Sequence, residues 1–181
     1  RVLFRSITVR RATPQDAAEI ANAHLNSWRE AYREMLPQDF LDSLPLTFKR
    51  RMQYWEKFAA QDHRALYVAE AKPGIVGFGG FRPSEEPEFK EHGEVGAIYL
   101  LEKYKNKGIG AALLTLGMQQ IVRWNFNKAY CWVLKGNPTI QFYEKSGAKF
   151  SGIEKEDDIA GKMYKEQAFE WQNLERYKNQ K

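Results

Sequence analysis

The sequence predicts a mixed α/β fold, and three observations support that class. Apolar runs typical of strands alternate with helical segments in the order β-α-α-β-β-β-α-β-α-β-β. A strand, a glycine-containing turn, an amphipathic helix and a second strand follow one another between residues 94 and 134. The 181 residues are 43% hydrophobic and 28% charged, which is the composition of a globular protein with a buried core.

The first elements are a strand and two long helices. Residues 7–11 alternate as a half-buried strand does. Residues 13–16 then supply a cap residue, a proline at the first helical position and an acid in the first turn, which together predict a helix start. That helix has a stripe at three- and four-residue spacing, formed by Ala17, Ile20, Ala21, His24, Trp28 and Tyr32. Pro37 and Pro45 interrupt the chain before a second helix at residues 47–60.

The middle of the chain reads as three strands. Residues 64–70 and 75–81 are strand-like and are joined by Lys72-Pro73-Gly74, a hairpin-type turn. An acidic loop, residues 83–93, leads to a third strand at residues 94–101.

The remaining elements are two helices and three strands. The apolar periodicity predicts a helix from 110 to about 124, and residues 129–134 fit a strand buried on both faces. Asn137-Pro138 begins a short helix that ends at Ser146-Gly147. Residues 149–172 predict two strands around a polar turn near Asp157 and Asp158.

Charge and cysteine content restrict the function classes. Lys plus Arg total 28 against 23 Asp plus Glu, which gives a net charge of +5 and favours a polyanionic partner. The lysines concentrate around one loop and the C-terminus, whereas a nucleic-acid binder needs a basic face with interleaved aromatics, so no nucleic-acid partner is expected. The single cysteine, Cys131, excludes an intrachain disulfide framework and a Cys-rich zinc site.

Domain organisation and location follow from the same features. No apolar run reaches the roughly 18 residues of a membrane span, so no membrane partner is expected and the location is predicted to be cytoplasmic. Residues 1–6 are interpreted as a tag remnant or disordered extension, and residues 7–175 as a single domain.

The turn before the central helix has the chemistry of a phosphate-binding site. Gly108 and Gly110 open the helix, where backbone N–H groups are free to bind an anion. Lys103, Lys105 and Lys107 add positive charge. A dinucleotide-binding fingerprint would need a third glycine where Leu113 stands, and no P-loop pattern is present.

This turn resembles motif A of the GNAT superfamily of acetyl-CoA-dependent N-acetyltransferases, [RQ]-x-x-G-x-[GA]. Residues 105–110 read Lys-Asn-Lys-Gly-Ile-Gly, with Lys at the first position. A second segment, residues 137–148, is similar to the family's N-x-x-A-x-x-F-Y-x-x-x-G-F, with Ile140 and Ala148 at two variable positions. The order of elements matches the family over nearly the whole chain.

The resemblance implies a fold and a cofactor site. The fold is a mixed, mostly antiparallel sheet of about six or seven strands, with a splayed motif A strand pair and flanking helices. Acetyl-CoA is the implied co-substrate, with the pyrophosphate on the turn and the pantetheine arm beside the preceding strand. The expected contact residues are Ile98, Tyr99, Leu100, Lys105, Asn106, Lys107, Gly108, Ile109, Gly110, Ala111 and Asn137.

The resemblance also gives candidate catalytic residues for direct attack of an amine on the thioester. Tyr143 matches the family's motif tyrosine and is the candidate general acid, since a phenol with a pKa of about 10 can protonate a leaving thiolate. Glu94 is the candidate general base. Other candidates for the base are His24, Glu91, His92 and Tyr99. No metal site is expected, because no His, Asp or Glu cluster has ligand spacing.

The resemblance also implies that the acceptor binds near the first helices and the loop before the motif A strand, with Trp28 and Tyr32 as candidate substrate-binding residues. The acidic loop either attracts a cationic amine or is a solvated surface loop. No feature of the sequence selects among small molecules and peptide or protein N-termini as substrates. An alternative function is a non-catalytic acyl-CoA-binding sensor or partner module. A homodimer is compatible with the resemblance, although no apolar stripe requires one.

Overall fold

Two compact units make up the chain, and both contain β-structure. The computed structural model describes residues 2–4 and 7–178, with side chains from residue 7 onward. The first unit comprises Arg1–Phe81 and Ala97–Gly117, and the second comprises Arg82–Gly96 and Met118–Lys181. The described strands are β1 (Val2–Phe4), β2 (Ile7–Arg11), β3 (Ala65–Ala71), β4 (Gly74–Pro83), β5 (His92–Leu100), β6 (Lys128–Leu134), β7 (Lys149–Ile159) and β8 (Lys162–Trp171). The described α-helices are α1 (Ala17–Ala31), α2 (Gln38–Ser43), α3 (Phe48–Ala59), α4 (Ile109–Arg123) and α5 (Ile140–Lys145).

The strand order is β1-β2-β3-β4-β5-β6-β8-β7 among the described residues. Strands β4 and β5 pass from one unit into the other, and β1 through β4 pair antiparallel in sequence order. From Ile7 onward seven strands are present, so the predicted mixed sheet with flanking helices is confirmed. Part of the extension expected at residues 1–6 lies outside the described residues, and its Val2–Phe4 segment pairs with β2.

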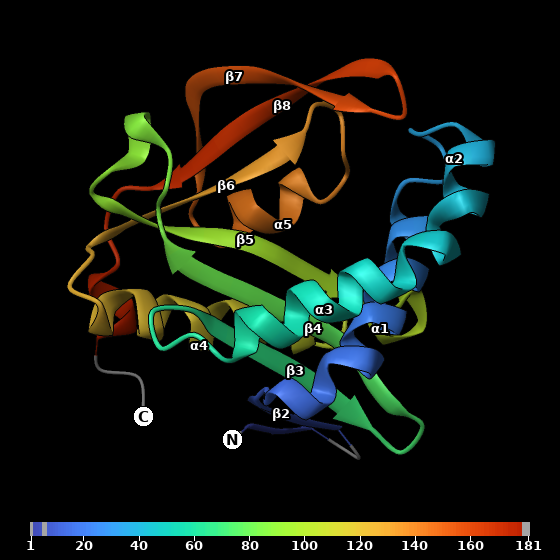
Figure 1. Ribbon diagram of the computed structural model, residues 1–181. Coiled ribbons are helices and arrows are strands. Elements are labelled where there is room, and N and C mark those ends of the chain that lie inside the picture. The colour runs from blue at the N-terminus through green and yellow to red at the C-terminus, as the bar shows by residue number, and fades with distance from the viewer. Residues whose placement is uncertain (1, 5–6, 179–181) are drawn as a thin grey trace. The chain divides into compact units, whose positions relative to one another are not determined.

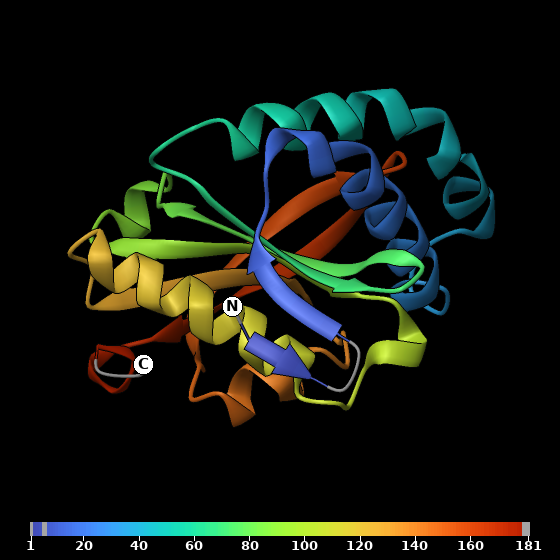
Figure 2. The same ribbon diagram turned by 90° about the horizontal axis from the view of Figure 1, so that it is seen from below.

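In the first unit, helices cover both faces of the strands because β4 alternates its side chains. Phe78 packs against Trp55 of α3 at 4.9 Å between ring centroids, so α3 covers that face. Figure 1 and Figure 2 both show α1 and α3 side by side. Phe81 points to the opposite face, where it contacts Gly117 of α4. A buried core that includes Ile20, Leu66 and Val68 fills the α1–α3 face.

Local sequence signals explain where α1 and β5 lie. Asp16 accepts a hydrogen bond from the Thr13 N–H (2.8 Å), and the 3-10 turn Pro14–Asp16 leads directly into α1, which confirms the predicted helix start. Gly77 of β4 allows a close approach of β5, because a Cβ there would lie 2.7 Å from the Tyr99 carbonyl oxygen. The Leu101 N–H donates to the Val76 carbonyl (3.0 Å) and completes this pairing.

In the second unit the first part of β5 pairs parallel with β6. The register covers His92, Gly93 and Glu94 opposite residues 128–130, and Val95 and Gly96 continue beyond it. This short pairing is the predicted splayed strand pair. Strand β8 pairs antiparallel with both β6 and β7.

Two boundaries in the second unit differ from the sequence prediction. The hairpin between β7 and β8 turns at Ala160 and Gly161, with φ values of 60° and 77°, rather than at Asp157 and Asp158. Asp158 instead accepts a hydrogen bond from the Gly161 N–H (2.7 Å). The acidic segment before β5 is not wholly a solvated loop, because it contains the 3-10 turn Pro87–Phe89, and Phe89 stacks on Tyr130 at 4.1 Å.

Gly117 gives a test of the packing of α4 on β4. A Cβ at this position would lie 2.0 Å from the fully buried Phe81 ring, so Gly117→Ala should lower the free energy of unfolding by about 2 kcal/mol. Helix propensity alone would predict a gain of about 1 kcal/mol from the same change. Urea unfolding measures the sign. The double variant Gly117→Ala with Phe81→Leu should lose less free energy of unfolding than the sum of the losses in the two single variants. A Gly117→Ala variant more stable than the wild type would contradict this packing.

Candidate functional site

The turn between β5 and α4 combines left-handed backbone with a helix start. Asn106 and Gly108 have φ values of 58° and 79°, and α4 begins at Ile109. The first N–H groups of α4 have no acceptor inside the helix. The predicted phosphate turn therefore leads directly into a helix start whose N–H groups suit an anion.

The three lysines of this turn stabilise it as well as adding charge. Lys105 Nζ pairs with Glu102 Oε2 at 2.5 Å, and Lys107 Nζ donates to the Lys103 carbonyl at 2.8 Å. The ammonium groups of Lys103 and Lys107 lie 5.2 and 5.6 Å from the ring centroid of the buried Tyr104. The sequence indicated the charges but not these contacts, which hold Lys103 and Lys107 against the ring of Tyr104.

An aromatic cluster lies beside the end of β5, in the same unit. It comprises His24, Trp28, Tyr32, Trp55, Phe78 and Tyr99. The hydroxyls of Tyr32 and Tyr99 are 3.2 Å apart, so a predicted substrate residue touches a predicted cofactor residue. Trp28 lies 4.8 Å from Tyr32 and 6.4 Å from Tyr99, measured between ring centroids. Ile98, Tyr99 and Leu100 are themselves half-buried.

His24 is held as a neutral imidazole inside this cluster. Trp55 Nε1 donates to His24 Nδ1 at 3.1 Å, and Arg51 Nη1 lies 3.1 Å from Nδ1 and 2.9 Å from Nε2. Burial, together with the charge of Arg51, lowers the pKa of His24 from 6.5 to about 3. A base this weak and this closely surrounded by donors is a poor choice for general base.

Glu94 lies in the second unit, on the part of β5 that pairs with β6. Its side chain is buried, and Arg82 Nε donates to Glu94 Oε2 at 2.6 Å. Arg82 also pairs with Glu85 at 2.9 Å, so part of the acidic segment is neutralised locally. The predicted general base is therefore a buried carboxylate whose orientation is fixed by its hydrogen bond from Arg82.

The other candidates for the base have different surroundings. His92 Nε2 pairs with Glu170 Oε1 at 2.5 Å, which links β5 to β8. Glu91 is exposed. Tyr99 belongs to the aromatic cluster of the first unit.

Tyr143 and Asn137 lie together at the short helix of the second unit. Asn137 Oδ1 accepts a hydrogen bond from the Thr139 N–H (2.8 Å). The prediction that Asn137 is the N-cap is wrong by two residues, because α5 begins at Ile140 and Thr139 is its N-cap. Tyr143 is buried on α5, with its ring 5.8 Å from Trp171 and nearly perpendicular to it. Trp171 Nε1 donates to the Ser146 carbonyl at the end of this helix (3.1 Å), so the ring that contacts Tyr143 is itself fixed.

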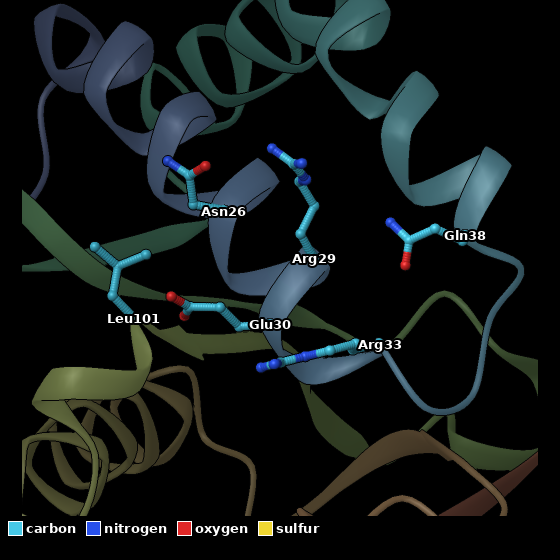
Figure 3. A pocket seen from close by; sticks show the side chains of 6 residues that line it. All are labelled: Asn26, Arg29, Glu30, Arg33, Gln38 and Leu101. Carbon is cyan, nitrogen blue, oxygen red and sulfur yellow. The ribbon is translucent and has the colours of Figure 1, made fainter.

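A separate pocket of about 460 Å³ lies on a polar stripe of α1 in the first unit. Figure 3 shows the side chains that line it, Asn26, Arg29, Glu30, Arg33, Gln38 and Leu101. Glu30 accepts the Glu102 N–H at 2.7 Å, and Arg29 pairs with Asp42 at 3.6 Å. Neither Trp28 nor Tyr32 lines this pocket, so the sequence prediction did not identify it. Helical spacing shows the stripe, but only the fold brings Gln38 and Leu101 to its edges.

Three further observations concern residues 2–4 and 7–178, the part that the structure describes: the single cysteine, metal ligands and helix length. Cys131 is buried and free, and burial raises the pKa of its thiol. No cluster of three or more His, Cys, Asp or Glu in this described part could hold a metal ion. None of its helices is long and apolar enough to cross a membrane.

Comparison with known proteins gives consistent matches. The model of the acetyltransferase (GNAT) family matches residues 25–148. The chain is 34% identical over 169 residues to YuaI of Bacillus subtilis (strain 168), an uncharacterized N-acetyltransferase, covering 93% of this chain and 94% of that protein. It is also 34% identical over 94 residues to an N-alpha-acetyltransferase of Sulfurisphaera tokodaii, covering 47% and 56% of the two chains. The fold is similar to PaiA N-acetyltransferase of Thermoplasma acidophilum in complex with coenzyme A, with a TM-score of 0.70, 17% identity and coverage of 90% and 98%.

The neutral state of His24 makes stability depend on pH. The folded-state pKa of about 3 lies below the 6.5 of the unfolded chain, so the unfolded chain binds the proton more readily between these values. The free energy of unfolding should therefore fall as the pH drops below 6.5, by about 3 kcal/mol at pH 4. Urea unfolding at a series of pH values measures this slope.

Two histidine variants identify its source. His24→Gln should flatten the slope between pH 4 and 6.5, and His63→Gln should retain it because His63 is exposed. An unchanged slope in His24→Gln would contradict the assignment.

Proposed function

Because the chain belongs to the acetyltransferase (GNAT) family and is an acetyl-CoA-dependent N-acetyltransferase, we propose that it acetylates a primary amine by direct attack on the thioester. The acceptor is a small molecule or the N-terminus of a peptide or protein. The observation that carries this proposal is the left-handed turn at Asn106 and Gly108, because it leads into the start of α4, where free backbone N–H groups suit a phosphate.

The residues of the first unit fit the phosphate end of acetyl-CoA. Backbone N–H groups from Asn106 to Ala111 supply the donors, and a glycine at 108 suits the left-handed φ of 79°. Lys107 and Lys103 place two ammonium groups at the same turn. Acetyl-CoA, when bound, supplies the activated acetyl group.

Two further contacts complete the proposed cofactor site. The backbone of Ile98, Tyr99 and Leu100 lies beside the pantetheine arm, and a backbone N–H of this segment supports the developing oxyanion. Asn137 contributes a second contact to the arm in addition to its role at the start of α5.

Glu94 and Tyr143 are the proposed general base and general acid. Arg82 Nε donates to Glu94 Oε2 and holds this carboxylate, which takes a proton from the attacking amine, directly or through water. The Tyr143 hydroxyl gives its proton to the departing thiolate, and packing against Trp171 fixes the ring. Trp28 and Tyr32 form the apolar wall of the acceptor site.

Release of free thiol from acetyl-CoA over a panel of amines tests the activity. Turnover should occur with at least one primary amine. Calorimetry with acetyl-CoA is the companion measurement, and an absence of binding would overturn the proposal. Binding without turnover on any amine would overturn its catalytic part.

Tyr143→Phe tests the general acid. Loss of the hydroxyl should lower kcat by about 100-fold while the KM for acetyl-CoA stays within about twofold, because only proton transfer is removed. Tyr54→Phe on the exposed side of α3 is the matched control and should retain full activity. An unchanged kcat in Tyr143→Phe would contradict the role.

Gly108→Ala tests the phosphate turn. A side chain at a left-handed φ costs about 1 kcal/mol, so the turn should open and acetyl-CoA affinity should fall about fivefold or more by calorimetry. Gly161→Ala is the matched control, because Gly161 has a φ of 77° in an open hairpin turn. The Gly161→Ala variant should lose similar stability and keep its affinity for acetyl-CoA. An equal loss of acetyl-CoA affinity in both variants would contradict the assignment of the phosphate turn.

A further inference from the structure

Arg51 of α3 is a half-buried cation without a carboxylate partner among the described residues. Its Nε donates to Thr47 Oγ1 at 2.9 Å, and its Nη1 lies against the ring of the neutral His24. The guanidinium carbon lies 5.1 Å from the centroid of the Trp28 ring. Every one of these partners is uncharged, so the positive charge is not balanced locally.

The surroundings of Arg51 contain more hydrogen-bond donors than acceptors. A neutral imidazole has one lone pair on its ring nitrogens, yet both Arg51 Nη1 and Trp55 Nε1 approach the His24 ring. Trp28 Nε1 is buried and has no partner in the described part of the chain. Unspent buried donors are unfavourable unless a ligand supplies the acceptor.

Electrostatics points to the same kind of ligand. Burial is the main cause of the lowered pKa of Arg51, while Tyr99 acts in the opposite direction, so a half-buried guanidinium gains from an incoming negative charge. A guanidinium presents parallel N–H groups that match two oxygens of a carboxylate. Among the polar groups near Arg51, the hydroxyls of Tyr32 and Tyr99 contact each other, whereas the buried Trp28 indole N–H has no partner in the described part of the chain and is suited to a small oxyanion.

We infer that Arg51 and the Trp28 indole N–H bind a carboxylate on the acceptor, so that the substrate is a small amine that also carries a carboxylate. This inference rests on the proposed N-acetyltransferase function and narrows its substrate class. The phosphates of acetyl-CoA have their own site at the turn of residues 105–110, so the anion at Arg51 belongs to the acceptor. Trp28 and Tyr32 then contact the acceptor's side chain while Arg51 orients its acidic group.

Matched substrates test the inference by activity. Amino acids and their amides share an amine and a side chain and differ in the carboxylate, and an aminoalkylphosphonate series tests a different oxyanion. The wild type should show a kcat/KM at least tenfold higher for the acids than for the amides. A preference for the amides would overturn the inference, and a preference for phosphonates over carboxylates would overturn the assignment of a carboxylate.

Variants at two adjacent arginines isolate the contact. Arg51→Gln should lower kcat/KM for acids at least tenfold and leave the amides within about twofold, and Arg51→Lys should recover part of the loss. Trp28→Phe retains an aromatic ring and removes the indole N–H, so it should lower kcat/KM for the acids by about three- to tenfold. Arg50→Gln is the control, since Arg50 is exposed on the same helix. Equal losses on acids and amides in a folded Arg51→Gln protein would overturn the inference.

A binding arm separates this inference from the proposed function. N-acetyl amino acids and N-acetyl amides are titrated against the wild type, with intrinsic tryptophan fluorescence as the readout. Only the N-acetyl amino acids should bind. Arg51→Gln should weaken their affinity at least tenfold, and Arg50→Gln should leave it unchanged. If acid binding depends on Arg51 but no amine is acetylated, the proposed function fails and the anion site stands. If amines are acetylated and acids bind no better than amides, the anion site fails alone.

Discussion

The left-handed backbone at Asn106 and Gly108 is the constraint on which the site in the first unit depends. Between Leu100, the end of β5, and Ile109, the start of α4, the chain must reverse and still expose the N–H groups of the new helix. The buried Tyr104 anchors the reversal, and the Glu102 N–H donates to Glu30 of α1. This last bond ties the phosphate turn to the helix that carries the aromatic cluster. A change in the turn therefore reaches both the proposed cofactor contacts and the proposed acceptor contacts.

Charge is distributed differently in the two units. In the second unit the buried Glu94 pairs with Arg82, and the half-buried Glu86 pairs with Lys155. In the described part of the first unit Arg51 has only neutral hydrogen-bond partners. The net positive charge of the sequence thus includes Arg51, and the proposed substrate class follows from the position of this residue rather than from the total charge.

Elements with strong periodicity were predictable, and contacts between distant elements were not. The apolar spacing at residues 110–124 locates α4 within one residue, and the glycines before it mark the phosphate turn. The last hairpin turn was misplaced because Ala160 has a left-handed φ of 60°, which its residue type does not favour. Spacing placed His24 and Trp28 on one stripe of α1. It gave no indication of Arg51, which is 27 positions from His24 and reaches it only because α1 and α3 pack together.

The burial of Cys131 has a practical consequence. Its thiol is 1% exposed, lies in β6 and has a raised pKa, so it is both inaccessible and protonated at neutral pH. Disulfide-exchange dyes react with accessible thiolates, and Cys131 is the one cysteine of the chain. The native protein should therefore not react with such a dye, and any colour that develops during turnover comes from the thiol of the released coenzyme. The same lack of reaction makes a cysteine introduced on the surface of this protein a unique attachment point for a spectroscopic label.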